Sequence, residues 1–120
     1  MSRVIHFEIP ADNPERAVTF YKNVFDWSIS KWEGPSDYRL ASTGPDDVPG
    51  IHGAIAPRDH KSTTIATDVP SVDEFTEKIV EAGGSVVMPK GPIPGIGYLA
   101  YCMDTEGNIF GIIESDPSAH

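Results

Sequence analysis

His6 and Glu8 are the residues of this chain best placed to do chemistry. They lie two positions apart in the segment Val-Ile-His-Phe-Glu-Ile, whose alternating apolar residues predict a β-strand. Side chains two positions apart on a strand share a face, so the imidazole and the carboxylate should lie together, opposite Phe7. A histidine whose tautomer is set by a carboxylate can serve as a general acid or base. The alternative is a structural histidine, hydrogen-bonded by a neighbouring strand or by water.

The strand that carries His6 begins a pattern that occurs twice in the sequence. Each copy predicts a strand, a capped amphipathic helix and three more strands, and the second copy follows the first by 58 positions. His6 then corresponds to Thr64, and Gly53 corresponds to Gly111. Neither copy could bury both faces of so small a sheet alone. The expected fold class is therefore α+β, with two βαβββ modules that form a curved mixed sheet, an inner cup and helices outside.

We expect a single domain over residues 1–120, with module 1 at about 3–57 and module 2 at about 62–116. The expected strands are residues 3–10, 27–30, 37–43 and 51–56 in the first module, and 63–69, 85–88, 98–103 and 108–114 in the second. Asp12 or Asn13 should cap the first helix, and Ser71 with Glu74 should form a capping box on the second. The Pro- and Gly-rich residues 89–97 are expected to form either a lid over the cup or a stiff connection.

Two long segments of the chain resemble a known superfamily. They are V-I-H-F-E-I-P-A-D-N-P-E-R-A-V-T-F-Y-K-N-V-F-D-W near the start and P-G-I-G-Y-L-A-Y-C-M-D-T-E-G-N-I-F-G-I near the end. Both resemble the vicinal oxygen chelate superfamily, which includes glyoxalase I, extradiol dioxygenases and bleomycin-resistance proteins. The chain looks most similar to short bacterial proteins related to lactoylglutathione lyase. This fold hosts several reactions and also plain binding proteins, so the resemblance implies no single activity.

The resemblance also implies a divalent metal ion in the cup, held by the first and last strands of each module. The matching positions are His6, Gly53, Thr64 and Gly111, of which only His6 is a good ligand. We therefore expect no cofactor; a divalent metal is possible but disfavoured. Glu8 shares the face of His6 and is the best replacement ligand, whereas strand parity directs His52 and Glu114 away from the metal positions.

Several further residues are candidates for ligand binding in the cup. Gly53, Thr64 and Gly111 would let a flat ligand approach the backbone, although glycines here could equally mark strand bends or bulges. Aromatic side chains could stack on a planar or cationic guest, or could instead belong to the core. These aromatic candidates are Trp32, Tyr38, Tyr98 and Tyr101.

Composition narrows the possible partners. The formal net charge of −9 disfavours nucleic acid and anionic membrane surfaces, and favours a neutral or cationic small molecule. Cys102 is the single cysteine, and we found neither a signal peptide nor a membrane span, so we expect a cytoplasmic protein. The resemblance implies a homodimer.

Two functional hypotheses follow from these observations. The leading one is a glyoxalase/bleomycin-resistance-like protein that binds a small organic molecule in the cup without the family metal tetrad. The alternative is a lyase or isomerase, with or without a metal, in which His6 and Glu8 act as acid and base.

Overall fold

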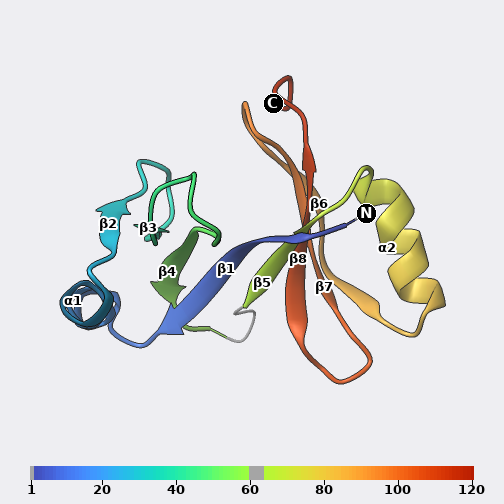
Figure 1. The fold of residues 1–120 in the computed structure, drawn as a ribbon. Helices are drawn as coiled ribbons and strands as arrows, with labels where there is room; N and C mark the ends of the chain where they lie inside the picture. The colour runs from blue at the N-terminus through green and yellow to red at the C-terminus, as the bar shows by residue number, and fades with distance from the viewer. Residues whose placement is uncertain (1, 60–63) are drawn as a thin grey trace. The chain divides into compact units, whose positions relative to one another are not determined.

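A computed structural model describes residues 2–59 and 64–120 of the chain. Two compact units are present, one formed by His6–Thr64 and the other by Ile65–His120 together with Met1–Ile5. Each contains one helix and four strands in the order strand, helix, three strands (Figure 1). The elements of the two modules are β1(Val4–Ala11), α1(Pro14–Phe25), β2(Ser28–Lys31), β3(Arg39–Ser42) and β4(Gly53–Pro57), then β5(Ile65–Asp68), α2(Val72–Glu81), β6(Ser85–Ile93), β7(Gly97–Met103) and β8(Ile109–Ser115). The prediction of an α+β fold built from two βαβββ modules is confirmed.

In the first module the strands lie in the order β2-β3-β4-β1. β1 and β4 are parallel, whereas β2, β3 and β4 pair antiparallel. α1 begins after Asn13, whose side-chain oxygen accepts a hydrogen bond from the Arg16 N–H at 3.1 Å. Asn13, rather than Asp12, is thus the cap. The helix ends at Asp26, which adopts the left-handed conformation with φ of 63°.

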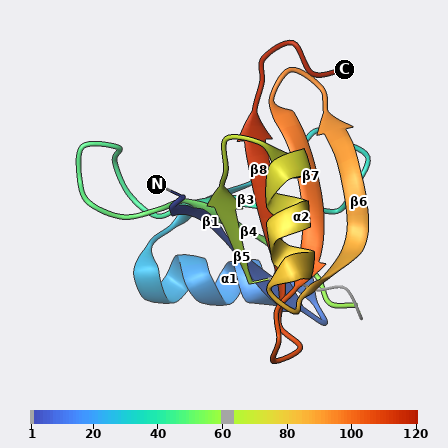
Figure 2. The same ribbon diagram turned by 90° about the vertical axis from the view of Figure 1, so that its right-hand side faces the viewer.

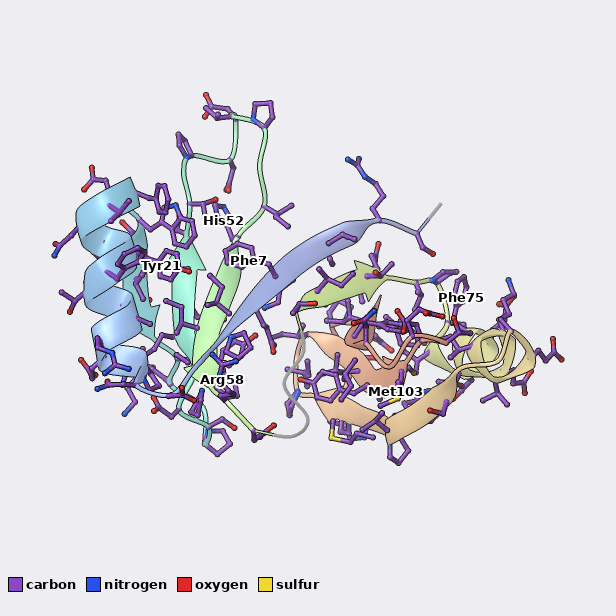
Figure 3. All side chains as sticks on the ribbon, turned by 90° about the horizontal axis from the view of Figure 1, so that it is seen from below. Phe7, Tyr21, His52, Arg58, Phe75 and Met103 are labelled. Carbon is purple, nitrogen blue, oxygen red and sulfur yellow. The ribbon has the colours of Figure 1, made fainter. Side chains whose placement is uncertain are left out.

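Aromatic side chains pack between α1 and the strands of the first module. The Trp27 ring stacks on Tyr21, with ring centroids 5.0 Å apart, and contacts Phe7 of β1 at 5.7 Å. Figure 3 shows Tyr21 on the side of α1 that faces these strands. This packing assigns Phe7 to the helix-covered face of the sheet. Because side chains alternate along a strand, His6 and Glu8 lie on the other face, as predicted.

The register of β4 corrects one prediction. Gly53 pairs directly with Phe7, and a Cβ added to Gly53 would lie 2.5 Å from the Phe7 ring. Gly53 therefore faces α1 and not the side of His6. Ala54 pairs with Glu8 and occupies the position that Gly53 was expected to hold. The repeat offset of 58 positions fails here by one residue, because the paired residues Glu8 and Ala54 are one position further apart in sequence than Ala66 and Gly111.

The second module has the strand order β5-β8-β7-β6, and α2 covers one face of it (Figure 2). The Ser71 side chain caps the helix by accepting a hydrogen bond from the Glu74 N–H at 3.1 Å. At the other end, Gly83 takes a φ of 99° and follows the C-cap residue Ala82, as the Gly-Gly pair predicted. The buried core under the helix consists of Val69, Val72, Ala100, Cys102 and Ile112, with Phe75, Ile79, Tyr98 and Phe110 packed against it.

The largest difference from the expected elements is in β6. Residues 85–88 were expected to be a strand and 89–97 a lid or connection, but β6 continues to Ile93 and pairs with β7. Two register shifts lie between Val86 and Met88 and between Met88 and Gly91, and the second leaves Pro89 without a partner in β7. A lid in this segment is therefore ruled out for residues 89–93. Residue 63, where the fifth strand was expected to begin, lies outside the described residues.

Candidate functional site

One face of the first-module sheet collects most of its polar side chains. Directly paired residues share a face, and the register pairs Ser28 with Ser42, Leu40 with Ala54, and Ala54 with Glu8. Alternation along β1 adds His6 to the same face. We call this surface the His6 face. Its members on β1–β4 are His6, Glu8, Ser28, Ser30, Leu40, Ser42 and Ala54.

His6 and Glu8 are joined on this face by the hydroxyl of Tyr38. The hydroxyl donates a hydrogen bond to Glu8 Oε2 at 2.6 Å and lies 2.7 Å from His6 Nε2. The direct separation of His6 Nε2 and Glu8 Oε2 is 4.0 Å. Tyr38 precedes β3 and is held by the hydrogen bond from the Trp32 N–H to its carbonyl at 2.7 Å. The sequence named all three residues, but gave Tyr38 a stacking role rather than this bridging one.

This geometry fixes the tautomer of His6. The single proton of the Tyr38 hydroxyl is donated to the Glu8 carboxylate, so the hydroxyl oxygen must accept from His6. Nε2 of His6 therefore carries a proton, and in the neutral ring Nδ1 holds a lone pair. Burial lowers the pKa of His6, and the nearby Glu8 carboxylate opposes this by raising it. Since the net direction is downward, the ring is neutral at pH 7 and Nδ1 can accept a proton or a hydrogen bond.

A cavity of about 600 Å³ opens beside His6. Its wall includes His6, Ser28, Ser30, Leu40 and Ser42 of the His6 face. Completing the lining are Lys22, Trp27, Ile29, Ala41, His52 and Gly53. All of these residues belong to the first module, so this half of the chain forms the cavity by itself.

His52 is held at the rim of this cavity by two hydrogen bonds. Its Nδ1 accepts from the Thr43 N–H at 3.1 Å, and its Nε2 lies 2.9 Å from Asp46 Oδ1. Because Nδ1 accepts, Nε2 is the nitrogen that carries the proton and donates to Asp46. Both ring nitrogens are thus engaged. His52 serves as part of the wall and has no nitrogen left for a ligand in this arrangement.

The comparison with protein families is decisive at this point. A family model of the Glyoxalase/Bleomycin resistance protein/Dioxygenase superfamily matches residues 3–112, nearly the whole chain. The chain belongs to this superfamily. The resemblance seen in the sequence is thereby confirmed, and the two βαβββ modules are those of the glyoxalase superfamily.

Individual relatives and solved structures are similar to the chain at low sequence identity. The protein named "Putative glyoxylase CFP32" from Mycobacterium bovis is 28% identical over 112 residues, which cover 92% of this chain and 43% of the relative. The chain thus spans less than half the length of that relative. Methylmalonyl-CoA epimerase from Mycobacterium tuberculosis has a TM-score of 0.70 at 14% identity, covering 95% of this chain and 88% of the epimerase. The Mn(II)-bound glyoxalase from Novosphingobium aromaticivorans has a TM-score of 0.66 at 17% identity, covering 98% of this chain and 38% of the glyoxalase.

The glyoxalase superfamily includes metal-dependent members, so the donor atoms here can be tested against a metal. Across residues 2–59 and 64–120, no group of three or more His, Cys, Asp or Glu side chains is placed to hold a metal ion. On the His6 face, the proton on His6 Nε2 points to Tyr38, and Glu8 accepts the Tyr38 proton. Ala54, which replaces Gly53 at the predicted metal position, has no donor atom. The donor set therefore does not fit the family metal centre.

The remaining candidates of the first module have mixed outcomes. Gly53 lines the cavity even though it faces the helix side of the sheet. The Trp32 ring makes an edge contact with Tyr38 at 6.0 Å, so it supports the bridging tyrosine. The Thr64 carbonyl accepts the Glu8 N–H at 2.8 Å, which ties the backbone of Thr64 to β1. Ligand contacts by these residues remain predictions.

In the second module, the two predicted tyrosines are on opposite faces of β7. Tyr98 packs against the core under α2, and Lys90 lies over its ring at 4.6 Å. Tyr101 lies beside Gly111 on the uncovered face. Glu114 accepts the Val72 N–H at 2.9 Å and so faces the helix, as strand parity predicted. The core alternative is thus the observed one for Tyr98, while Tyr101 and Gly111 stay candidates for ligand contact.

Sequence reasoning missed the serines of the cavity wall. Ser28, Ser30 and Ser42 were counted only as strand residues. The alternation Ser-Ile-Ser at 28–30 carried the information, because it places two hydroxyls on one face of β2. Lys22 was missed as well, since it lies on the helix and the search for ligands followed the strands.

Proposed function

We propose that this member of the glyoxalase superfamily binds a small organic molecule in the cavity beside His6. The observation that supports the proposal is the cavity itself, whose volume of about 600 Å³ lies within the range of small-molecule sites. Its wall combines apolar groups such as Leu40 with the polar groups of His6, Ser28 and Ser42. Few, convergent polar groups in a mainly apolar wall are typical of sites that orient a ligand.

A fragment screen by amide correlation NMR tests this proposal. Compounds that bind should shift the amide resonances of Ser28, Ser42 and Gly53, which lie in three different segments of the wall. The buried core residues Cys102 and Ile112 of the other module are the internal control and should not shift. A screen in which no compound moves the three cavity amides would refute the proposal.

We also propose that binding does not use the family metal tetrad. The donor atoms of the His6 face support this, because His6 has one unprotonated ring nitrogen, Nδ1, and Ala54 has no donor atom at the position of a family ligand. Purified protein is incubated with Ni²⁺, Zn²⁺, Mn²⁺ or Fe²⁺, freed of excess metal and measured by mass spectrometry for metal content. Near-stoichiometric metal that is lost in His6→Ala would overturn this proposal and favour a metal-dependent enzyme.

A second candidate function, acid/base catalysis, is favoured by one specific observation. The hydrogen-bonded chain from His6 through Tyr38 to Glu8 holds Nε2 protonated and leaves Nδ1 as a base. When Nδ1 takes a proton, the Glu8 carboxylate 4.0 Å away stabilises the imidazolium. Such a group could remove a proton from a carbon next to a carbonyl.

Deuterium exchange separates the two functions. The hemithioacetal of methylglyoxal and glutathione, or methylmalonyl-CoA, is incubated with the protein in D₂O. An enzyme should introduce deuterium beside the carbonyl, and His6→Ala should abolish the exchange while keeping the fold. Exchange that persists in His6→Ala would sink the acid/base role, whereas a binding protein gives no exchange in either form.

The assembly and the cellular site follow as smaller proposals. We propose a homodimer in the cytoplasm, with a small molecule as partner rather than nucleic acid or membrane. No helix among residues 2–59 and 64–120 is long and apolar enough to span a membrane. Light scattering on the purified protein tests the dimer, and a monomer mass would contradict it.

A further inference from the structure

The charge of the cavity wall differs from the charge of the whole chain. The chain carries a formal net charge of −9. The wall, however, contains Lys22 and no aspartate or glutamate among its lining residues. Local composition decides which ligand charge a site accepts at contact distance, since the field of distant exposed carboxylates is screened within about 10 Å at ordinary ionic strength. The residues that line the cavity thus include a positive charge and no negative one, in an acidic protein.

Lys22 is available to a ligand. It lies exposed in the last turn of α1, and within the described parts of the chain no carboxylate lies within ion-pair distance of its ammonium group. Two carboxylates that lie beside residues of the wall have hydrogen-bond partners of their own. Glu8 accepts the Tyr38 hydroxyl, and Asp46 accepts the His52 ring N–H.

Serine hydroxyls provide donors in the wall of the same cavity that Lys22 lines. Ser28 and Ser42 are paired across β2 and β3, so their side chains adjoin on the His6 face. In the described chain, neither hydroxyl is hydrogen-bonded to another protein group. A carboxylate has two oxygens that accept hydrogen bonds, and an ammonium group with adjacent hydroxyls matches this requirement. Leu40 adds an apolar contact for the rest of the ligand.

From this arrangement we infer that the cavity selects a small organic carboxylate, with Lys22 pairing to the anion and Ser28 and Ser42 donating to its oxygens. The inference rests on the proposed binding function and names its ligand class. It replaces the expectation, drawn from net charge alone, of a neutral or cationic guest.

Three probes of one shape and different charge test the inference. Benzoate, benzamide and benzamidinium carry charges of −1, 0 and +1 on the same ring, and each is titrated into ¹⁵N-labelled protein. Benzoate should shift the amide resonances of Ser28 and Ser42. Its affinity should exceed that of benzamide about fivefold or more, and benzamidinium should bind most weakly. A fivefold difference in affinity is what one exposed ion pair contributes.

Two matched variants assign the charge preference to Lys22. Lys22→Gln should weaken benzoate binding about fivefold and leave benzamide unchanged. Lys31→Gln also removes one positive charge, but from the face of β2 opposite Ser28 and outside the cavity wall. It should leave the affinities for benzoate and for benzamide unchanged. Lys22 is exposed and outside the core, so both variants should fold.

The possible failures are distinguishable. Benzamidinium or benzamide binding as tightly as benzoate would overturn the inference and still support small-molecule binding. Benzoate affinity that survives Lys22→Gln would overturn it too. If none of the three probes shifts the cavity amides, the inference is refuted, and the fragment screen decides the proposed function separately.

Discussion

Replacing Tyr38 with phenylalanine tests the hydrogen-bonded chain on the His6 face. Tyr38→Phe keeps the ring contacts with Trp32 and His6 but removes the hydroxyl that joins His6 to Glu8. A neutral hydrogen bond contributes about 1 kcal/mol and one to a carboxylate about 1.5–3 kcal/mol. His6 and Glu8 side chains are 29% and 17% exposed, so water replaces part of this. We expect the free energy of unfolding to fall by about 1–3 kcal/mol.

The measurement is urea unfolding of wild type and Tyr38→Phe at pH 7.5, with Tyr21→Phe as the matched control. The Tyr21 hydroxyl has no hydrogen-bond partner in the described part of the chain, so its loss should change stability by less than about 0.5 kcal/mol. A second measurement is the His6 tautomer, read from imidazole nitrogen–proton correlations. The Nε2–H form should dominate in wild type and lose its dominance in Tyr38→Phe.

Two outcomes would refute this reasoning. If Tyr38→Phe costs no more than Tyr21→Phe, the hydroxyl does not link His6 and Glu8 in solution. If the wild-type ring carries its proton on Nδ1, then Tyr38 donates to His6 and the assignment of the free lone pair is wrong. A stability loss without a tautomer change would leave Tyr38 a structural residue only.

Three further predictions concern the same module. Glu8→Gln should lower the pKa of His6 further, because the Glu8 carboxylate, 4.0 Å from His6 Nε2, stabilises the imidazolium by a Coulomb energy of about 1 kcal/mol or more. Proton NMR titration measures the pKa of His6, and an unchanged pKa in the variant would contradict the prediction. Because the pKa of His6 is lowered in the folded state, the unfolded state binds more protons between that lowered pKa and 6.5. The free energy of unfolding should therefore rise with pH through this window, and this contribution should be lost as the pH falls. In urea unfolding at pH 5 and 7.5, His6→Gln should reduce the difference in stability between the two pH values. A variant with the same difference as wild type would contradict this prediction. Gly53→Ala should lower the free energy of unfolding by about 1–3 kcal/mol, because the added Cβ would meet Phe7. Gly91→Ala should lower it far less, since a Cβ there meets nothing within 4 Å. Equal losses of stability in thermal unfolding would contradict the observed register.

Local signals in the sequence predict local structure well in this chain. The cap residues Asn13 and Ser71 and the glycine pair after α2 mark the helix ends because each satisfies orphan backbone groups within a few residues. The face of His6 and Glu8 also follows from strand alternation alone. These features depend on neighbours in sequence, which a single chain displays directly.

Features that depend on distant residues were predicted less well. The segment between the paired residues of β1 and β4 is one residue longer than its counterpart in the second module, so the repeat offset placed Gly53 on the wrong face. The strand β6 runs through Pro89 because the register shift between Met88 and Gly91 leaves that residue without a partner in β7, whereas composition alone predicts a loop. The bridge from Tyr38 spans 32 positions to His6, and no periodicity encodes it.

The two modules share a fold, but the first strands of the two modules carry different side chains. On the His6 face of the first module, β1 supplies an imidazole and a carboxylate; at the matching positions of the second module stand Thr64 and Ala66. Gly111 pairs with Ala66 and with Tyr101 on the uncovered face of the second module, so these three residues include no histidine or carboxylate. Its helix-covered face, in contrast, holds a close-packed apolar core that includes Val72 and Cys102. Substitutions in that core should therefore alter the stability of the chain, while the selectivity of the cavity should change only with residues of the first module.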